Sequence, residues 1–250
     1  MKIKIVLTLF FLCAAQAFAV SSRDVQTGEK VSFKTPDGVI ISGLFHKPAS
    51  SLNKTFILLH GLGSNQEEWQ SFTDKLVSAG YGVLSYDARG HGKSSERSDG
   101  RNINYNNFGP PGPGSEWGKM IDDLGDAVNF LKTEKNITVK KVGLIGASVG
   151  ANVCLIYAAK TPEISVVVLL SPGLNYAGFG TLGAIEAFTA RPIELSASPQ
   201  DTYAYQSSIL LYQKVQGNKR ASFLPGAAGH GVQMFDGKFD NQLIKWIRAH

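Results

Sequence analysis

The sequence is poor in the residues that bind metals or form disulfide bonds. Two cysteines and five histidines occur among its 250 residues, and no group of histidines, cysteines and aspartates has the spacing of a metal site. The chain also lacks internal repeats and, beyond its first residues, any long apolar run. We therefore expect no metal, no cofactor and no stable membrane anchor in the mature protein.

Excess charge is also small. The formal net charge is +5 at pH 7, which is too mild to indicate a nucleic-acid-binding surface. With 43% hydrophobic residues, the chain can bury the core of an α/β domain, and its length favours a single domain. The sequence leaves the oligomeric state open.

The N-terminus has the features of a secretory signal peptide. Lys2 and Lys4 precede an apolar run that is too short to span a bilayer comfortably, and Ala17-Phe18-Ala19 supplies a small-residue cleavage site. We expect cleavage after residue 19, which leaves a single secreted or periplasmic domain of residues 20–250. Cleavage also removes Cys13, so Cys154 has no partner for an intrachain disulfide bond.

Apolar strands alternate with amphipathic helices along the mature chain. Continuous apolar runs are typical of buried strands, and apolar residues at a spacing of three or four indicate helices. The predicted strands span residues 31–35, 39–46, 55–59, 81–86, 164–170, 192–197 and 219–224, and the predicted helices span 67–79, 117–135, 202–215 and 236–250. This order predicts a mostly parallel sheet with helices on both faces and an antiparallel hairpin at its start. Residues 175–190 hold one possible helix and are too few for a large cap domain.

Residues 140–157 predict a buried strand, a tight turn and a helix, with Gly146-x-Ser148-x-Gly150 at the turn. This spacing is typical of a nucleophile elbow, in which the serine stands clear of the backbone at a sharp bend. Glycine is needed two residues on either side because those positions lie very close to neighbouring backbone. The alternative is a turn whose serine only caps the helix.

A serine nucleophile needs a histidine base and an acid that orients it. His230 follows the last predicted strand, and Asp201 follows the strand before it, so both lie at the strand ends where Ser148 also lies. The competing acid, Glu194, falls within its strand, and Asp201 could instead cap the helix that begins at residue 202. We expect no catalytic role for the remaining histidines: His60 and His91 hold glycine-rich loops by hydrogen bonds, and His46, in or at the end of a strand, and the terminal His250 are incidental.

Negative charge on a reacting carbonyl oxygen would need two hydrogen-bond donors. The backbone N–H of Val149 directly follows the nucleophile. The backbone N–H of Leu62 lies in the glycine-flanked loop after the strand 55–59. We expect these two groups to form the oxyanion hole.

Taken together, these motifs resemble those of the α/β-hydrolase family, particularly small secreted bacterial esterases and dienelactone-hydrolase-like members. The resemblance covers nearly the whole mature chain and rests on His60-Gly61-Leu62-Gly63, Asp87-x-Arg89-Gly90-His91-Gly92-x-Ser94, the elbow, Asp201 and His230. It implies Ser148 as nucleophile, Asp201 as acid, His230 as base, and Leu62 and Val149 as oxyanion donors. Residues 100–114, rich in glycine, proline and asparagine, depart from the family pattern and form either a surface loop or the border of the site.

We therefore expect a serine hydrolase that cleaves small-molecule esters of short acyl chains through an acyl-Ser148 intermediate. A peptidase or amidase, or an acyltransferase, could use the same three residues. A binding protein without activity could also share the scaffold. The sequence does not identify the acyl group or the leaving group.

Overall fold

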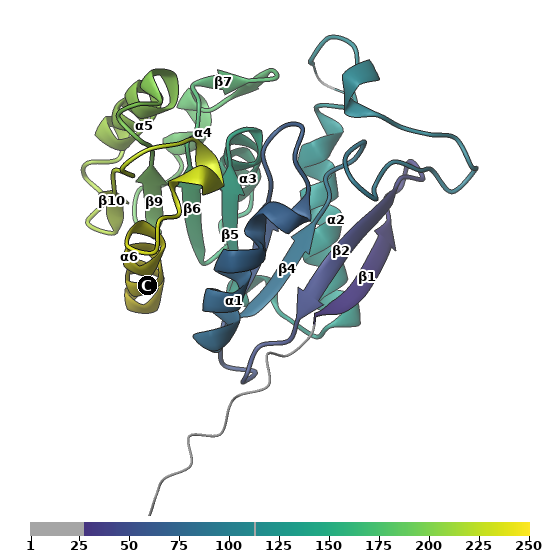
Figure 1. Ribbon diagram of the computed structural model, residues 1–250, viewed down its shortest axis with the longest axis horizontal. Helices are drawn as coiled ribbons and strands as arrows, with labels where there is room; N and C mark the ends of the chain where they lie inside the picture. The colour runs from purple at the N-terminus through teal and green to yellow at the C-terminus, as the bar shows by residue number, and fades with distance from the viewer. Residues whose placement is uncertain (1–27, 113) are drawn as a thin grey trace, which may run out of the picture.

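The structure is a computed structural model that describes residues 28–112 and 114–250 (Figure 1). The predicted signal peptide, residues 1–19, lies outside the described residues. In residues 28–112 and 114–250, no helix is both long enough and apolar enough to cross a membrane.

Eight strands form one sheet. They are β1 (Glu29–Lys34), β2 (Ile40–His46), β3 (Thr55–Leu59), β4 (Gly82–Tyr86), β5 (Val142–Ala147), β6 (Val166–Leu170), β9 (Ile193–Ser196) and β10 (Ala221–Phe223). Their order across the sheet is β1-β2-β4-β3-β5-β6-β9-β10. The two pairs that involve β2 are antiparallel, and all other neighbouring pairs are parallel. The mostly parallel sheet and its antiparallel start are therefore confirmed.

Helices cover both faces of this sheet (Figure 1). They are α1 (Gln70–Ser78), α2 (Lys119–Glu134), α3 (Val149–Lys160), α4 (Leu182–Ile185), α5 (Thr202–Lys214) and α6 (Phe239–Ala249). Successive side chains of a strand point to opposite faces, so β3 contributes to two apolar layers. Ile57 and Leu59 pack in the layer that contains α2 and α3, whereas Phe56 and Leu58 pack in the layer that contains α1 and α6.

The segment between β6 and β9 differs from the sequence-based expectation. Besides the short helix α4, it contains a two-stranded hairpin of β7 (Asn175–Tyr176) and β8 (Phe179–Gly180). Strands of two residues leave no hydrophobic periodicity, so the sequence pattern could not reveal them. In residues 171–192, all of which the structure describes, the hairpin and α4 are the only regular elements. This agrees with the expectation that the segment holds no large cap domain.

A buried cation connects the turn after β4 to three other segments. The Arg89 side chain is 1% exposed and contacts both carboxylate oxygens of Asp123 in α2, at 2.7 and 2.6 Å. It also contacts Glu116 at 2.6 Å and Asp37, in the turn between β1 and β2, at 3.1 Å. Because a buried guanidinium is costly unless its N–H groups are paired, this arrangement fixes the end of the irregular segment 95–118, at Glu116, against the turn after β4.

Candidate active site

Ser148 lies at a strained turn between β5 and α3. Its backbone φ is 54°, a left-handed conformation that is uncommon for residues other than glycine. A Cβ atom on Gly146 would lie 2.4 Å from the carbonyl oxygen of Gly150, and one on Gly150 would lie 2.3 Å from that of Leu59. Such distances are below any allowed contact, so the turn requires glycine at both positions.

His230 and Asp201 are brought together from loops that follow β10 and β9. Nδ1 of His230 lies 2.5 Å from Oδ2 of Asp201, so Nδ1 carries the proton that it donates, and Nε2 is left as an acceptor. Asp201 also occupies the N-cap position of α5, but its side chain makes no capping hydrogen bond. Its carboxylate therefore serves the histidine rather than the helix.

Ser148 and His230 line one cleft of about 260 Å³. The loop after β3 contributes Gly61, Leu62 and Gly63 to its wall. Within the described residues, no hydrogen bond joins the Ser148 hydroxyl to the imidazole, as is common in structures without substrate. The sequence-predicted nucleophile and base thus share a cleft, while base and acid are already in contact.

Ser171, which the sequence analysis missed, holds the His230 loop in place. It follows β6, has a φ of 50° and is fully buried. Its hydroxyl accepts a hydrogen bond of 2.9 Å from the backbone N–H of Gly231. A sequence signal existed, since Ser171-Pro172-Gly173 ends a buried strand as Ser148 does, but the partner lies 60 residues away.

Hydrogen bonds of the buried His60 side chain connect the loop after β3 to the turn after β4. Its Nε2 accepts from the backbone N–H of Ala88 at 2.9 Å, and its Nδ1 contacts the carbonyl oxygen of Gly61 at 2.7 Å. Burial lowers the pKa of His60 to about 4, so the ring is neutral at pH 7. The expectation that this histidine supports a glycine loop is confirmed.

The two expected oxyanion donors have free backbone N–H groups. Within the described residues, neither Leu62 nor Val149 donates its backbone N–H to an acceptor. For Val149 this follows from its place as the first residue of α3, where an N–H has no intrahelical partner. The positive end of that helix faces the same turn.

Residues 100–112, the described part of the irregular segment, approach the site without lining the cleft. The Tyr105 ring stacks on His91 with centroids 4.1 Å apart, and a Cβ on Gly63 would lie 3.2 Å from the Tyr105 hydroxyl. Ile103 and Phe108 are buried in the core. The segment therefore packs against the loop after β3 through Tyr105 and reaches the core through Ile103 and Phe108.

Glu194 does not contact His230. Its side chain is 1% exposed within β9, where its carboxylate accepts hydrogen bonds from Ser196 and Ser222. Burial raises the pKa of Glu194 to about 7. The expectation that Glu194 falls within its strand is confirmed.

Glu194→Gln should change how stability depends on pH. An acid whose pKa is higher in the folded than in the unfolded state destabilises the fold as it ionises. For Glu194 this loss of unfolding free energy develops as the pH rises from its ordinary pKa of 4.5 to its folded-state pKa of about 7. The variant should therefore gain up to about 3 kcal/mol in unfolding free energy, relative to wild type, between pH 4.5 and pH 8. Urea unfolding at both pH values measures this, and an equal difference at the two would contradict it.

Neither the free cysteine nor any group of metal-binding side chains provides a second candidate site in the described residues. Cys154 is fully buried in α3, and burial raises the pKa of its thiol. No group of three histidine, cysteine, aspartate or glutamate side chains in residues 28–112 and 114–250 is placed to hold a metal ion.

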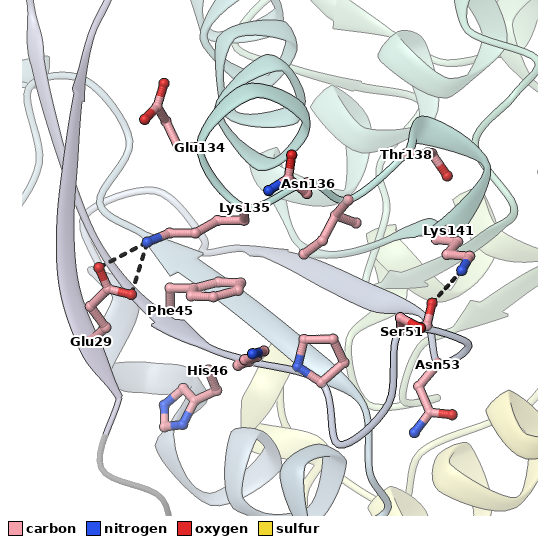
Figure 2. Close-up of a pocket in the computed structure, with 13 residues that line it drawn as sticks. Glu29, Phe45, His46, Ser51, Asn53, Glu134, Lys135, Asn136, Thr138 and Lys141 are labelled. Carbon is pink, nitrogen blue, oxygen red and sulfur yellow. Dashed lines mark hydrogen bonds and ion pairs between the residues drawn. The ribbon is translucent and has the colours of Figure 1, made fainter.

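A larger cavity, of about 600 Å³, lies at the opposite edge of the sheet, where β3 and β5 begin (Figure 2). Figure 2 shows Lys135 reaching across it to Glu29, at 2.8 Å, above the ring of Phe45. Lys141 donates to the carbonyl oxygen of Ser51 on its other side. Since parallel sheets bind substrates at the carboxyl ends of their strands, the smaller cleft at Ser148 is the candidate active site.

Several known proteins resemble this chain in sequence. A thiohydrolase, apmlB, of Arthrinium phaeospermum is 29% identical over 145 residues, which cover 58% of this chain and 43% of that protein. The chain thus spans less than half the length of that relative. An uncharacterized protein, YfhR, of Escherichia coli is 27% identical, with 90% of this chain and 82% of the other covered.

Solved structures agree with the fold. An esterase of Pyrococcus furiosus superposes with a TM-score of 0.71 at 23% identity, covering 90% of this chain and 94% of the other. A dienelactone hydrolase of Anabaena variabilis superposes with a TM-score of 0.65 at 18% identity, covering 90% and 99%. At these identities the likeness establishes the α/β-hydrolase fold.

The sequence also matches a described protein family over residues 50–199, more than half of the chain. This stretch includes β3 to β9 and the elbow with Ser148, while Asp201 and His230 lie beyond it. The family is described as serine aminopeptidase, S33. The chain therefore belongs to the serine aminopeptidase (S33) family and is an α/β-hydrolase.

Proposed function

We propose that this protein is a carboxylesterase that cleaves esters of short acyl chains through an acyl-Ser148 intermediate. The observation that carries the proposal is the 2.5 Å contact of His230 with Asp201 beside the cleft that Ser148 lines. That contact orients Nε2 as a proton acceptor, which is what a serine hydroxyl needs to become nucleophilic.

In the first half of the reaction, the Ser148 oxygen attacks the ester carbonyl carbon while Nε2 of His230 takes the hydroxyl proton. Asp201 stabilises the imidazolium that forms. The N–H groups of Leu62 and Val149 donate to the carbonyl oxygen as it becomes negative. The intermediate then collapses, the bond to the alcohol oxygen breaks, and His230 returns the proton to the leaving alkoxide.

The second half repeats these steps with water. His230 removes a proton from a water molecule, whose oxygen attacks the acyl carbon. The tetrahedral intermediate uses the same two N–H donors. As it collapses, the bond between the acyl carbon and the Ser148 oxygen breaks, His230 returns its proton to that oxygen, and the carboxylic acid is released. Each step uses only side chains and backbone groups around one cleft.

The small cleft and the short segment between β6 and β9 support a short acyl chain, because no large cap domain provides a long apolar channel. Tyr176 of the β7–β8 hairpin packs edge-on beside His230, with the two ring centroids 6.3 Å apart. The structurally similar esterase of Pyrococcus furiosus and a carboxyl esterase of Bacillus coagulans, with a TM-score of 0.70 at 13% identity, support ester substrates. We also propose that residues 1–19 direct export, so that the enzyme acts outside the cytoplasm.

A panel of substrates tests this function against its main alternatives. Purified protein should hydrolyse p-nitrophenyl acetate and butyrate with the highest kcat/KM, and octanoate and laurate with lower values. Aminoacyl p-nitroanilides should react at least about 100-fold more slowly. Faster cleavage of the anilides would instead establish a peptidase, as the family description suggests, and no turnover of any substrate would favour a binding protein.

A further inference from the structure

Glu68 contributes a carboxylate to the candidate active site that the proposed reaction does not use. It lies in the 3-10 turn Gln66–Trp69, which follows the loop after β3, and it lines the same cleft as Ser148 and His230. Its Oε1 accepts the backbone N–H of Gly61 at 3.1 Å. Its carboxylate also accepts a hydrogen bond from Ser64, another cleft residue.

These contacts place the carboxylate close to the reacting atoms. Gly61 lies next to both Glu68 and Ser148. Its N–H donates to the Glu68 carboxylate, and a Cβ on this glycine would lie 3.5 Å from the Cβ of Ser148. The hydrogen bonds from Gly61 and Ser64 favour the ionised carboxylate, although burial raises the pKa of Glu68 above its ordinary value. These two hydrogen bonds stabilise the ionised form, and charge selectivity is best tested at pH 8, on the alkaline side of the group's ordinary pKa of 4.5.

The cleft contains no fixed positive charge to balance it. Among the described residues that line the cleft, none is a lysine or an arginine, and His230 is the only other titratable side chain. Asp201 adds a second carboxylate behind His230. Apart from His230, the titratable side chains at the site are therefore acidic, although the whole chain has a net charge of +5.

We propose that Glu68 makes this cleft selective for esters that carry a positive charge within a few atoms of the scissile carbonyl, an inference that rests on the proposed esterase function. A cation in the cleft takes the place of the missing counter-charge, whereas an anion meets repulsion. Two charges roughly 6 Å apart at an effective dielectric constant near 40 change affinity by about tenfold.

Two pairs of esters test this selectivity because their members have the same shape and differ only in charge. Choline butyrate and 3,3-dimethylbutyl butyrate place the difference on the alcohol side. The p-nitrophenyl esters of 4-(trimethylammonio)butyrate and 5,5-dimethylhexanoate place it on the acyl side. Using ratios of kcat/KM within a pair cancels effects of His230 protonation, which both members share.

In at least one pair, wild-type protein at pH 8 should prefer the cationic member by about fivefold or more. Glu68→Gln keeps an oxygen that can accept the Gly61 N–H but removes the charge, so its ratio should fall to about one. Glu67→Gln is the matched control: it removes the same charge from the adjacent, exposed residue outside the cleft, and its ratio should equal that of wild type.

Three outcomes would overturn the inference: a wild-type ratio near one or below in both pairs, an unchanged ratio in Glu68→Gln, or an equal loss in Glu67→Gln. If Glu68→Gln does not fold, inhibition of wild type decides instead. Choline should then inhibit butyrate ester hydrolysis at a concentration at least about fivefold lower than 3,3-dimethylbutan-1-ol does. Failure to hydrolyse even the neutral esters would reject the esterase function itself, a result distinct from hydrolysis without charge preference.

Discussion

Ser148→Ala should lower kcat/KM for p-nitrophenyl butyrate by about 10⁴-fold or more. The variant loses only the hydroxyl group. Without this group the acyl-enzyme cannot form, whereas the oxyanion donors and the cleft remain. A fluorophosphonate probe reacts with activated serines, so intact-mass analysis should find one adduct on wild type and none on the variant. Unchanged thermal unfolding would show that the loss is chemical.

Ser165→Ala provides the matched control for that experiment. The Ser165 hydroxyl contacts the carbonyl oxygen of Val142 at the edge of the sheet opposite the site, so its removal should leave activity and labelling unchanged. Persistent labelling or turnover in Ser148→Ala would mean that another residue is the nucleophile, and the elbow would then be only a structural turn.

Asp201→Asn should lower kcat by about 10⁴-fold with little change in fold. An asparagine would present its N–H₂ group as a donor to Nδ1 of His230. The imidazole then holds its proton on Nε2, the nitrogen that must accept from Ser148, and the imidazolium loses its counter-charge. Steady-state kinetics on the butyrate ester, together with the thermal unfolding midpoint, measure both parts of this expectation.

Glu194→Gln separates the two acids considered from the sequence. It removes a carboxylate from the neighbouring strand, yet this group contacts Ser196 and Ser222 rather than His230. Its kcat should therefore stay within about threefold of wild type. If Glu194→Gln were inactive and Asp201→Asn active, the assignment of the acid would be wrong.

Much of the fold could be predicted because the core strands repeat one simple pattern. β3 and β6 consist entirely of buried residues, and such continuous apolar runs are characteristic of strands covered on both faces. The helices between them have spaced apolar residues for the same reason: one side of each contacts the sheet. Helix and strand limits shifted by a few residues, as at α1, where a 3-10 turn precedes the helix.

The candidate site was predictable where local geometry restricts the residue type. Gly146 and Gly150 are fixed by contacts shorter than 3 Å to neighbouring backbone, so the elbow leaves a mark in the sequence. Asp201 and His230 could be selected because both follow strands and parallel strands end at one edge of the sheet. The contact between Asp201 and His230 also depends on the order of the strands in the sheet. The alternation of strands and helices along the chain allows only a few such orders.

Residues that act through distant partners could not be found in this way. Ser171 supports Gly231 across 60 positions, and Glu68 matters because it contacts the backbone of Gly61. Neither contact imposes a spacing or a periodic pattern, and serine and glutamate are common on loops and helix starts. Only the folded backbone brings such pairs together.

The placement of His230 and Asp201 after the two outermost parallel strands couples activity to the margin of the sheet. β10 has three residues, pairs with β9 alone and contains no fully buried residue. Local opening of so short a strand costs less than unfolding the centre, and it would carry the base away from an otherwise intact elbow. Heating should therefore inactivate the protein before it melts, and a ligand that contacts both Ser148 and His230 would delay that early inactivation more than global denaturation.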